Sequence, residues 1–272
     1  MQRRDTVVSL ALIALAAFAA SAHAQAPDWK RIRVGVEGAY PPFSEVGPDG
    51  KLKGFDIDIT NAICAQLKAE CVLVQQDFDA MIPGLNAKKI DAVVASMSIT
   101  PERQKSVDFS NKYYSTPARF VAKASAKLDV SAAGLKGKKI GVQRSTIHDR
   151  FATDTFKQSE IVRYTKQDDV YLDLAAGRID GALLDSVAAD EGFLKRPQGK
   201  GYAFAGPLYT DPKYFGIGAG IAIRKGDAAL QKKLNDAIAA IRANGTYKKL
   251  QDKYFAFDVY GAEVTASATT KP

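Results

Sequence analysis

Histidine is almost absent from this chain of 272 residues, which contains two, and His148 is the only one beyond residue 24. A Ser-His-Asp or Cys-His arrangement would have to use that one side chain. The G-x-S-x-G, H-E-x-x-H and P-loop patterns are also missing. We therefore expect no catalysis, no cofactor and no metal site. His148 is expected in the first turn of a helix, near enough to a binding loop to touch a ligand, and a surface position is favoured over a general-base role.

Long apolar runs are lacking apart from one near the N-terminus, from Val7 to Ala20. Arg3 and Arg4 precede it, and an A-x-A pattern at residues 22–24 follows it. This order predicts a signal peptide over residues 1–24, cleaved so that the mature chain begins at 25. A membrane anchor is disfavoured because the run is short and rich in alanine. The protein is thus expected in the periplasm.

Cysteine is scarce, since only Cys64 and Cys71 occur, with six residues between them. In an exported chain two such residues predict a disulfide bond, which would join the end of one helix to the start of the next strand. A zinc site would need more ligands than these two thiols, and none lie nearby in the sequence.

Charge is plentiful and unbalanced, with 38 Lys and Arg against 30 Asp and Glu. This excess of positive charge would be compatible with a nucleic-acid partner. Against it, the basic residues are spread along the chain, and the densest group is only Lys136, Lys138 and Lys139. We interpret these charges as solvated surface and expect no nucleic-acid partner. The basic exterior does not determine the charge of a ligand held in a cleft.

Strand-like and helix-like segments alternate along the chain, which predicts an α/β protein with parallel sheets flanked by helices. Strands are expected at Ile32–Val36, Cys71–Val74, Lys139–Val142, Ile161–Tyr164 and Ile179–Leu184. Helices are expected at Phe55–Leu67, Ile147–Phe156 and Asp169–Ala176, and a helix pair interrupted at Gly245 is expected at Ala228–Tyr254. The small, polar residues 263–272 predict a disordered tail.

Two strand-to-helix turns have the composition of ligand-binding loops. Residues 95–103 end a strand in small hydroxyl residues, begin a helix at Thr100-Pro101-Glu102, and then offer the guanidinium of Arg103 to a carboxylate. Residues 143–146 can present backbone N–H groups to an anion at a helix N-terminus. The first turn could equally be a simple helix cap with an exposed arginine, and the second a plain connection.

Several motifs, taken in order, resemble the type II periplasmic amino-acid-binding proteins of ABC importers (solute-binding protein family 3), above all the lysine/arginine/ornithine- and histidine-binding group. The resemblance covers nearly the whole mature chain. The segments that carry it are Ala39–Phe43, Gly54–Ile59, Ile82–Leu85, Ser98–Thr100, Gly177–Asp180, Glu191–Leu194 and Asp258–Gly261.

The resemblance implies a two-lobed periplasmic binding protein type II fold with two hinge crossings. Lobe 1 would comprise residues 25–115 and 216–262, and lobe 2 residues 116–215. A cationic L-amino acid would lie between the lobes, which close around it. The implied partner is the membrane permease of an ABC importer, and the protein would act as a monomer.

The resemblance also implies how the ligand is held. Arg103, Ser98 and the backbone N–H of Thr146 would bind the α-carboxylate, while Asp185 and Ser96 would bind the α-ammonium group. From the residues alone, Asp185 would be interpreted as a helix N-cap, and Tyr40 and Phe78 as core aromatics. The implied ligand-binding residues are Glu37, Tyr40, Phe78, Ser96, Met97, Ser98, Arg103, Gln143, Ser145, Thr146 and Asp185.

Glu37 departs from the group, which often carries Asp at the position that meets the distal cation. A carboxylate is retained, so a cationic ligand is still expected: arginine or ornithine first, lysine next and histidine weaker. Ala95 replaces a serine of the group, and the Arg144 side chain should turn away from a cationic ligand. The alternatives are an opine-binding protein, a free sensor protein, and a cyclohexadienyl-dehydratase-type enzyme on the same fold.

Overall fold

The structure, a computed structural model, describes residues 29–261. The expected signal peptide and the expected disordered tail at residues 263–272 lie outside this range. Within it, no helix combines the length and the apolar character that crossing a bilayer requires.

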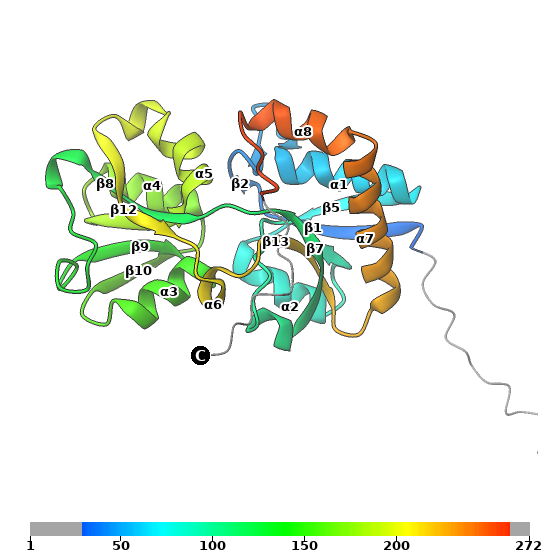
Figure 1. The fold of residues 1–272 in the computed structure, drawn as a ribbon, viewed down its shortest axis with the longest axis horizontal. Coiled ribbons are helices and arrows are strands. Elements are labelled where there is room, and N and C mark those ends of the chain that lie inside the picture. Colours follow the sequence, from blue (N-terminus) through cyan, green and yellow to red (C-terminus); the bar gives the residue numbers. More distant parts are fainter. Residues whose placement is uncertain (1–28, 262–272) are drawn as a thin grey trace, which may run out of the picture.

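Two five-stranded sheets form the centres of two lobes, and a small sheet of β2, β3 and β4 accompanies the first (Figure 1). The first sheet has the order β5-β1-β6-β13-β7 and the second β10-β9-β11-β8-β12. The strands are β1 Arg31–Val36, β2 Ala39–Tyr40, β3 Ser44–Val46, β4 Leu52–Lys53, β5 Glu70–Gln75, β6 Ala92–Val93, β7 Val107–Tyr114, β8 Ala118–Lys123, β9 Lys139–Gln143, β10 Glu160–Tyr164, β11 Gly181–Asp185, β12 Tyr202–Tyr209 and β13 Ala219–Arg224.

Helices cover both faces of each sheet. The α-helices are α1 Phe55–Leu67, α2 Met81–Asn86, α3 Ile147–Thr155, α4 Gln167–Ala175, α5 Ser186–Ala189, α6 Pro212–Phe215, α7 Ala228–Ala243 and α8 Thr246–Tyr254. Short 3-10 turns occur at η1 Phe78–Ala80, η2 Arg103–Lys105, η3 Ala124–Ala126 and η5 Pro197–Gly199, and η4 Asp190–Leu194 is a π-helical turn.

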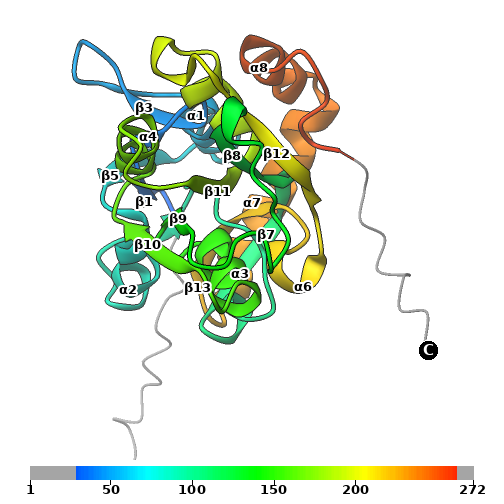
Figure 2. The ribbon, with the colours of Figure 1, turned by 90° about the vertical axis from the view of Figure 1, so that its left-hand side faces the viewer.

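Side-chain alternation along the central strands builds a core on either side of each sheet. In β11, Leu183 packs with α3, whereas Ala182 and Leu184 pack with α4 on the opposite face. Figure 2 views this lobe end-on, with the second sheet in front of the first. In the first sheet, the core that contains Val34 includes residues of α1 and α7, and the core that contains Val93 includes residues of α2.

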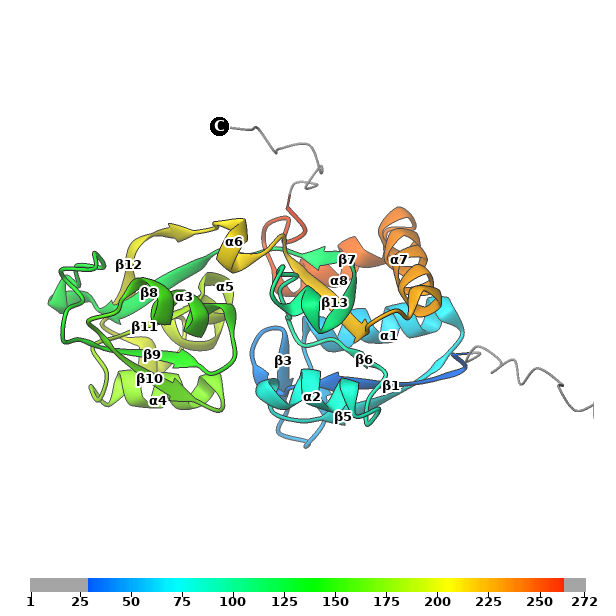
Figure 3. The same ribbon diagram turned by 90° about the horizontal axis from the view of Figure 1, so that it is seen from below.

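The chain passes between the two sheets twice, from β7 to β8 and from β12 through α6 to β13 (Figure 3). The first sheet is therefore assembled from segments on both sides of the second in the sequence. The lobe boundaries expected at residues 115 and 216 remain a prediction. The two connections place the carboxyl ends of β1, β9 and β11, and the segments that follow them, around one space between the lobes.

The main predicted helices and strands are present, with ends shifted by at most two residues; α1 begins and ends where periodicity predicted. The expected parallel pairing is found between β1 and its neighbours β5 and β6, and between β9 and its neighbours β10 and β11. The sheets are mixed, however, because β13 runs antiparallel to β6 and β7, and β8 runs antiparallel to β11 and β12. Strands that return directly from the other lobe need no crossover helix. The helix expected after Thr100-Pro101-Glu102 is only the turn η2. The disulfide between Cys64 and Cys71 is present and joins α1 to β5.

Candidate functional site

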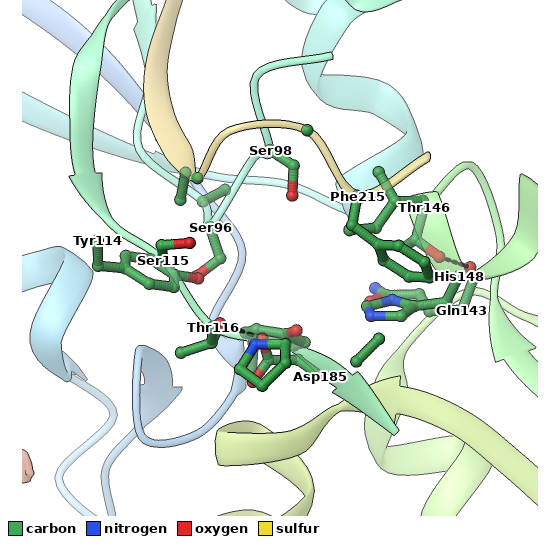
Figure 4. A pocket seen from close by; sticks show the side chains of 18 of the residues that line it. Ser96, Ser98, Tyr114, Ser115, Thr116, Gln143, Thr146, His148, Asp185 and Phe215 are labelled. Atoms are coloured by element: carbon green, nitrogen blue, oxygen red, sulfur yellow. Dashed lines mark hydrogen bonds between the residues drawn. The ribbon is translucent and has the colours of Figure 1, made fainter. Parts of the chain in front are cut away.

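A cavity of about 200 Å³, partly open to solvent, lies between the two sheets (Figure 4). Residues from both lobes line it, as expected where the carboxyl ends of strands meet a cleft. Nine of the eleven predicted ligand-binding residues are among those that line it: Glu37, Tyr40, Phe78, Ser96, Ser98, Arg103, Gln143, Thr146 and Asp185.

Glu37 supplies a buried carboxylate at one end of the cavity. It directly follows β1, and the Gln143 side-chain amide from the other lobe donates to its Oε1 at 2.5 Å. Burial raises the pKa of Glu37 to about 7; the Gln143 hydrogen bond opposes this rise, and the nearby charges of Asp168, Asp77 and Asp56 add to it. A cation beside Glu37 would reverse the effect, so this end of the cavity is suited to a positively charged group.

Arg103 supplies the positive charge of the cavity. Its Nη1 donates to the carbonyl oxygen of Ser98 at 2.9 Å, and its Nη2 donates to the carbonyl oxygen of Ser145, in the other lobe, at 3.2 Å. Its guanidinium also lies over the Phe78 ring, 5.4 Å from the ring centre. These contacts hold the planar group in place at the cavity wall, where it can meet an anion from the ligand.

Asp185, the last residue of β11, faces the same cavity. One of its oxygens accepts from the backbone N–H groups of Val187 and Ala188, each at 2.9 Å, and the other accepts from the Thr116 hydroxyl. The side chain therefore caps α5 and also lines the cavity. Burial raises its pKa to about 6, against these hydrogen bonds. A carboxylate accepts more than three hydrogen bonds, so capacity remains for a ligand ammonium group.

Two predicted residues do not line the cavity. The Met97 side chain is fully buried in the core beside α2, whereas its neighbours Ser96 and Ser98 line the cavity. Ser145 is exposed and has a positive φ of 63°; it offers its carbonyl oxygen to Arg103 instead of its hydroxyl group to the cavity. Thr146 lines the cavity and also caps α3, accepting from the backbone N–H of Asp149.

Arg144 does not line the cavity either, in line with the expectation that its side chain turns away. Its Nε lies 2.6 Å from the Oδ2 atom of Asp79, a residue of the first lobe. Together with the contacts between Glu37 and Gln143 and between Arg103 and Ser145, this ion pair links the two lobes around the cavity.

His148 was wrongly expected at the surface. Its side chain is 6% exposed and lines the cavity, as its expected place near a binding loop allows, close to Phe215, a residue that the sequence did not single out. Burial and the charge of Arg103 lower the pKa of His148 to about 3, so the imidazole is neutral. Thr116 was missed as well. The position of His148, two residues after a predicted binding turn, was the one sequence feature that indicated a place near the ligand. Phe215 and Thr116 belong to connections between the lobes that show no sequence pattern.

The charges of the site complement a ligand of defined polarity. One guanidinium and two buried carboxylates, Glu37 and Asp185, face a single cavity. A small molecule with one carboxylate and two cationic groups would pair all three. A ligand that lacked one of these groups would leave a charge desolvated and unpaired, which costs several kcal/mol.

Comparison with known proteins gives a consistent result. The sequence model of the bacterial extracellular solute-binding proteins, family 3, matches residues 32–257. The chain is 53% identical to the L-arginine-binding protein of Pseudomonas aeruginosa, over 94% of this chain and 96% of that one. It is 44% identical to the lysine/arginine/ornithine-binding periplasmic protein of Escherichia coli, over 95% of this chain and 99% of that one. A solved periplasmic binding protein of Salmonella typhimurium, described as highly specific for arginine, superposes with a TM-score of 0.77 at 36% identity, covering 84% of this chain and 100% of that one.

Proposed function

Because the chain belongs to the bacterial extracellular solute-binding proteins of family 3, we propose that it binds a cationic L-amino acid and delivers it to the membrane permease of an ABC importer. Arginine or ornithine is the preferred ligand, lysine follows, and histidine binds more weakly. The protein works in the periplasm as a monomer and releases its ligand unchanged. The names of the relatives described above support the choice of ligand class.

The observation that carries this proposal is the charge pattern of the cavity, which Arg103 lines together with two buried carboxylates. The α-carboxylate of the ligand pairs with Arg103, the α-ammonium group with Asp185, and the distal cation with Glu37. Each such charge-assisted hydrogen bond contributes roughly 1.5–3 kcal/mol. Glutamine would leave Glu37 without a cation, and glutamate would place a second negative charge beside it.

The remaining contacts follow from the positions of the lining residues. Ser98 and the backbone of Thr146 assist Arg103 at the carboxylate, and Ser96 assists Asp185 at the ammonium group. Tyr40 and Phe78 pack against the aliphatic stem. Lobe 1, residues 25–115 and 216–262, carries Arg103 and Glu37, while lobe 2, residues 116–215, carries Asp185. Closing the hinge therefore brings Arg103 and Glu37 toward Asp185, so that both lobes contact the ligand.

Titration calorimetry with a ligand panel tests the proposal. The protein is first unfolded in denaturant and refolded to remove any ligand acquired during production. Arginine, ornithine, lysine, histidine, glutamine and glutamate are then titrated. We expect tight binding of the first three and weaker binding of histidine. The cationic assignment is lost if glutamine or glutamate binds while arginine, ornithine and lysine do not.

Arg103→Ala should raise the Kd of every ligand by about a hundredfold or more, since an unpaired buried carboxylate costs roughly 3–5 kcal/mol. Arg119→Ala is the matched control, because Arg119 donates to the carbonyl oxygen of Gly206 in the second lobe and does not line the cavity. It should leave the affinities unchanged. Equal effects of the two substitutions would show that the loss has a general cause.

Release of the ligand unchanged is tested separately. Arginine kept with stoichiometric protein for a day and then recovered by denaturation should give the NMR spectrum of the starting material. A new product that forms with the wild-type protein but not with Arg103→Ala would instead indicate an enzyme.

A further inference from the structure

Asp56 is a fully buried carboxylate that lies just behind the cavity wall. It is the second residue of α1, has 0% exposure and does not itself line the cavity. Among the described residues, no lysine or arginine forms an ion pair with it. A buried acid without a cation is costly, so its position calls for an explanation.

Two hydroxyl groups hold the Asp56 carboxylate. Ser96 Oγ donates to its Oδ2 at 2.9 Å, and the Tyr113 hydroxyl donates to its Oδ1 at 2.8 Å. The Tyr113 oxygen in turn accepts from the backbone N–H of Ser96 at 3.2 Å. The N-terminal turn of α1 adds a favourable dipole for negative charge. Ser96 is thus held twice, at a backbone φ of 53° that is unusual for a residue other than glycine.

The contact with Asp56 determines which face of the Ser96 hydroxyl is available to a ligand. A serine hydroxyl has one hydrogen and two lone pairs, whereas an ionised carboxylate can only accept. The Ser96 hydrogen therefore points back to Asp56. Its oxygen, which lines the cavity, is left to accept a hydrogen bond from the ligand.

We propose that Asp56 is a positioning residue that fixes the Ser96 hydroxyl as an acceptor, and so makes the cleft select ligands with an ammonium group at the α-carbon. The inference rests on the proposed function, because it assumes that the amino acid lies with its ammonium group toward Ser96 and Asp185. It assigns selectivity for the α-ammonium group to a side chain that never touches the ligand.

The protonation of Asp56 is consistent with this role. Burial raises its pKa to about 7, while the hydrogen bonds from Tyr113 and Ser96 act in the opposite direction. A bound ammonium group one hydroxyl away favours the ionised form. Binding of the ligand thus fixes the orientation of the hydroxyl that receives it.

The test compares arginine with deamino-arginine, which carries a hydrogen in place of the α-ammonium group. Asp56→Asn preserves the shape of the side chain but can present an N–H to Ser96 and turn its hydroxyl around. We expect the preference for arginine, measured as the ratio of the two Kd values by calorimetry, to fall at least tenfold, with the Kd of deamino-arginine changed less than threefold. A purely structural role would weaken both ligands equally and leave the ratio unchanged, which would overturn the proposal.

Asp58→Asn is the matched control, since Asp58 lies in the same turn of α1 but accepts from Lys253 and Tyr254 of α8. It should keep the wild-type ratio. In a Ser96→Ala background, Asp56→Asn should cause no further change in the ratio, because the two residues act through one hydroxyl. Ser96→Ala alone also serves if Asp56→Asn does not fold, and an unchanged ratio in that variant would refute the inference. Failure of the wild-type protein to bind arginine would instead refute the proposed function.

Discussion

Acidification should weaken the binding of arginine more than that of citrulline, its neutral analogue of almost equal shape. The reason is the buried carboxylate of Glu37, whose pKa burial raises to about 7 in the ligand-free cleft. A guanidinium beside it favours the ionised form and lowers this pKa, whereas the urea group of citrulline does not. Below pH 7 the protein must therefore release a proton to bind arginine.

The magnitude follows from the linkage between proton release and binding. One pH unit corresponds to about 1.4 kcal/mol, so the ratio of the citrulline Kd to the arginine Kd should fall up to tenfold for each unit below pH 7. Because about half of Glu37 is ionised at pH 7, the change between pH 7 and pH 5.5 is roughly fifteenfold, or about 1.6 kcal/mol. Between pH 8 and pH 7 the ratio should fall only about twofold, since Glu37 is largely ionised at pH 8 and about half ionised at pH 7.

Competition calorimetry at pH 8, 7, 6 and 5.5 measures this ratio. Burial also raises the pKa values of Asp185 and Asp56, to about 6 and about 7, but both ligands carry the same zwitterion, so these contributions cancel in the ratio. Glu37→Gln is the matched control and should give a ratio that does not vary with pH. The reasoning is refuted if the wild-type ratio stays constant within twofold, or if Glu37→Gln shows the same slope as the wild-type protein.

Two further predictions concern the linkages outside the cavity. Reduction of the disulfide bond between Cys64 and Cys71, which are seven positions apart, should lower the free energy of unfolding by about 2–3 kcal/mol. Urea unfolding with and without reductant measures this difference, and coincident unfolding curves would contradict it. Asp79→Asn, which removes the partner of Arg144, should raise the Kd of every ligand about two- to fivefold, the contribution of a partly exposed ion pair that links the lobes. Calorimetry with the ligand panel is the check, and a changed order of ligands would show that this pair senses the side chain of the ligand.

Much of the fold was predictable from local patterns. In α7, Leu230, Leu234, Ile238 and Ile241 recur at three and four residues and are all buried. The exact bounds of α1 followed from the same kind of periodicity. Strand order and direction could not be predicted in this way, because the residues of β13 show no pattern that indicates whether a neighbouring strand runs parallel or antiparallel.

The candidate site was predictable only in part. The motif resemblance singled out Glu37, Arg103 and Asp185, and the structure places all three around one cavity. It also singled out Met97, whose side chain lies in the core, because a motif marks a segment and not the direction of each side chain in it. His148 shows the opposite error, since it has no apolar pattern around it that would predict burial.

The sequence by itself determined the α/β class, the main helices and strands, and the disulfide, because these depend on residues that are neighbours along the chain. Only the tertiary structure decided which polar groups meet. Gln143 reaches Glu37 across 106 positions, and Ser96 reaches Asp56 across 40. Such contacts form only when whole sheets and helices pack against one another. Their positions are therefore set by the packing of the core as a whole, and not by the two residues that make the contact.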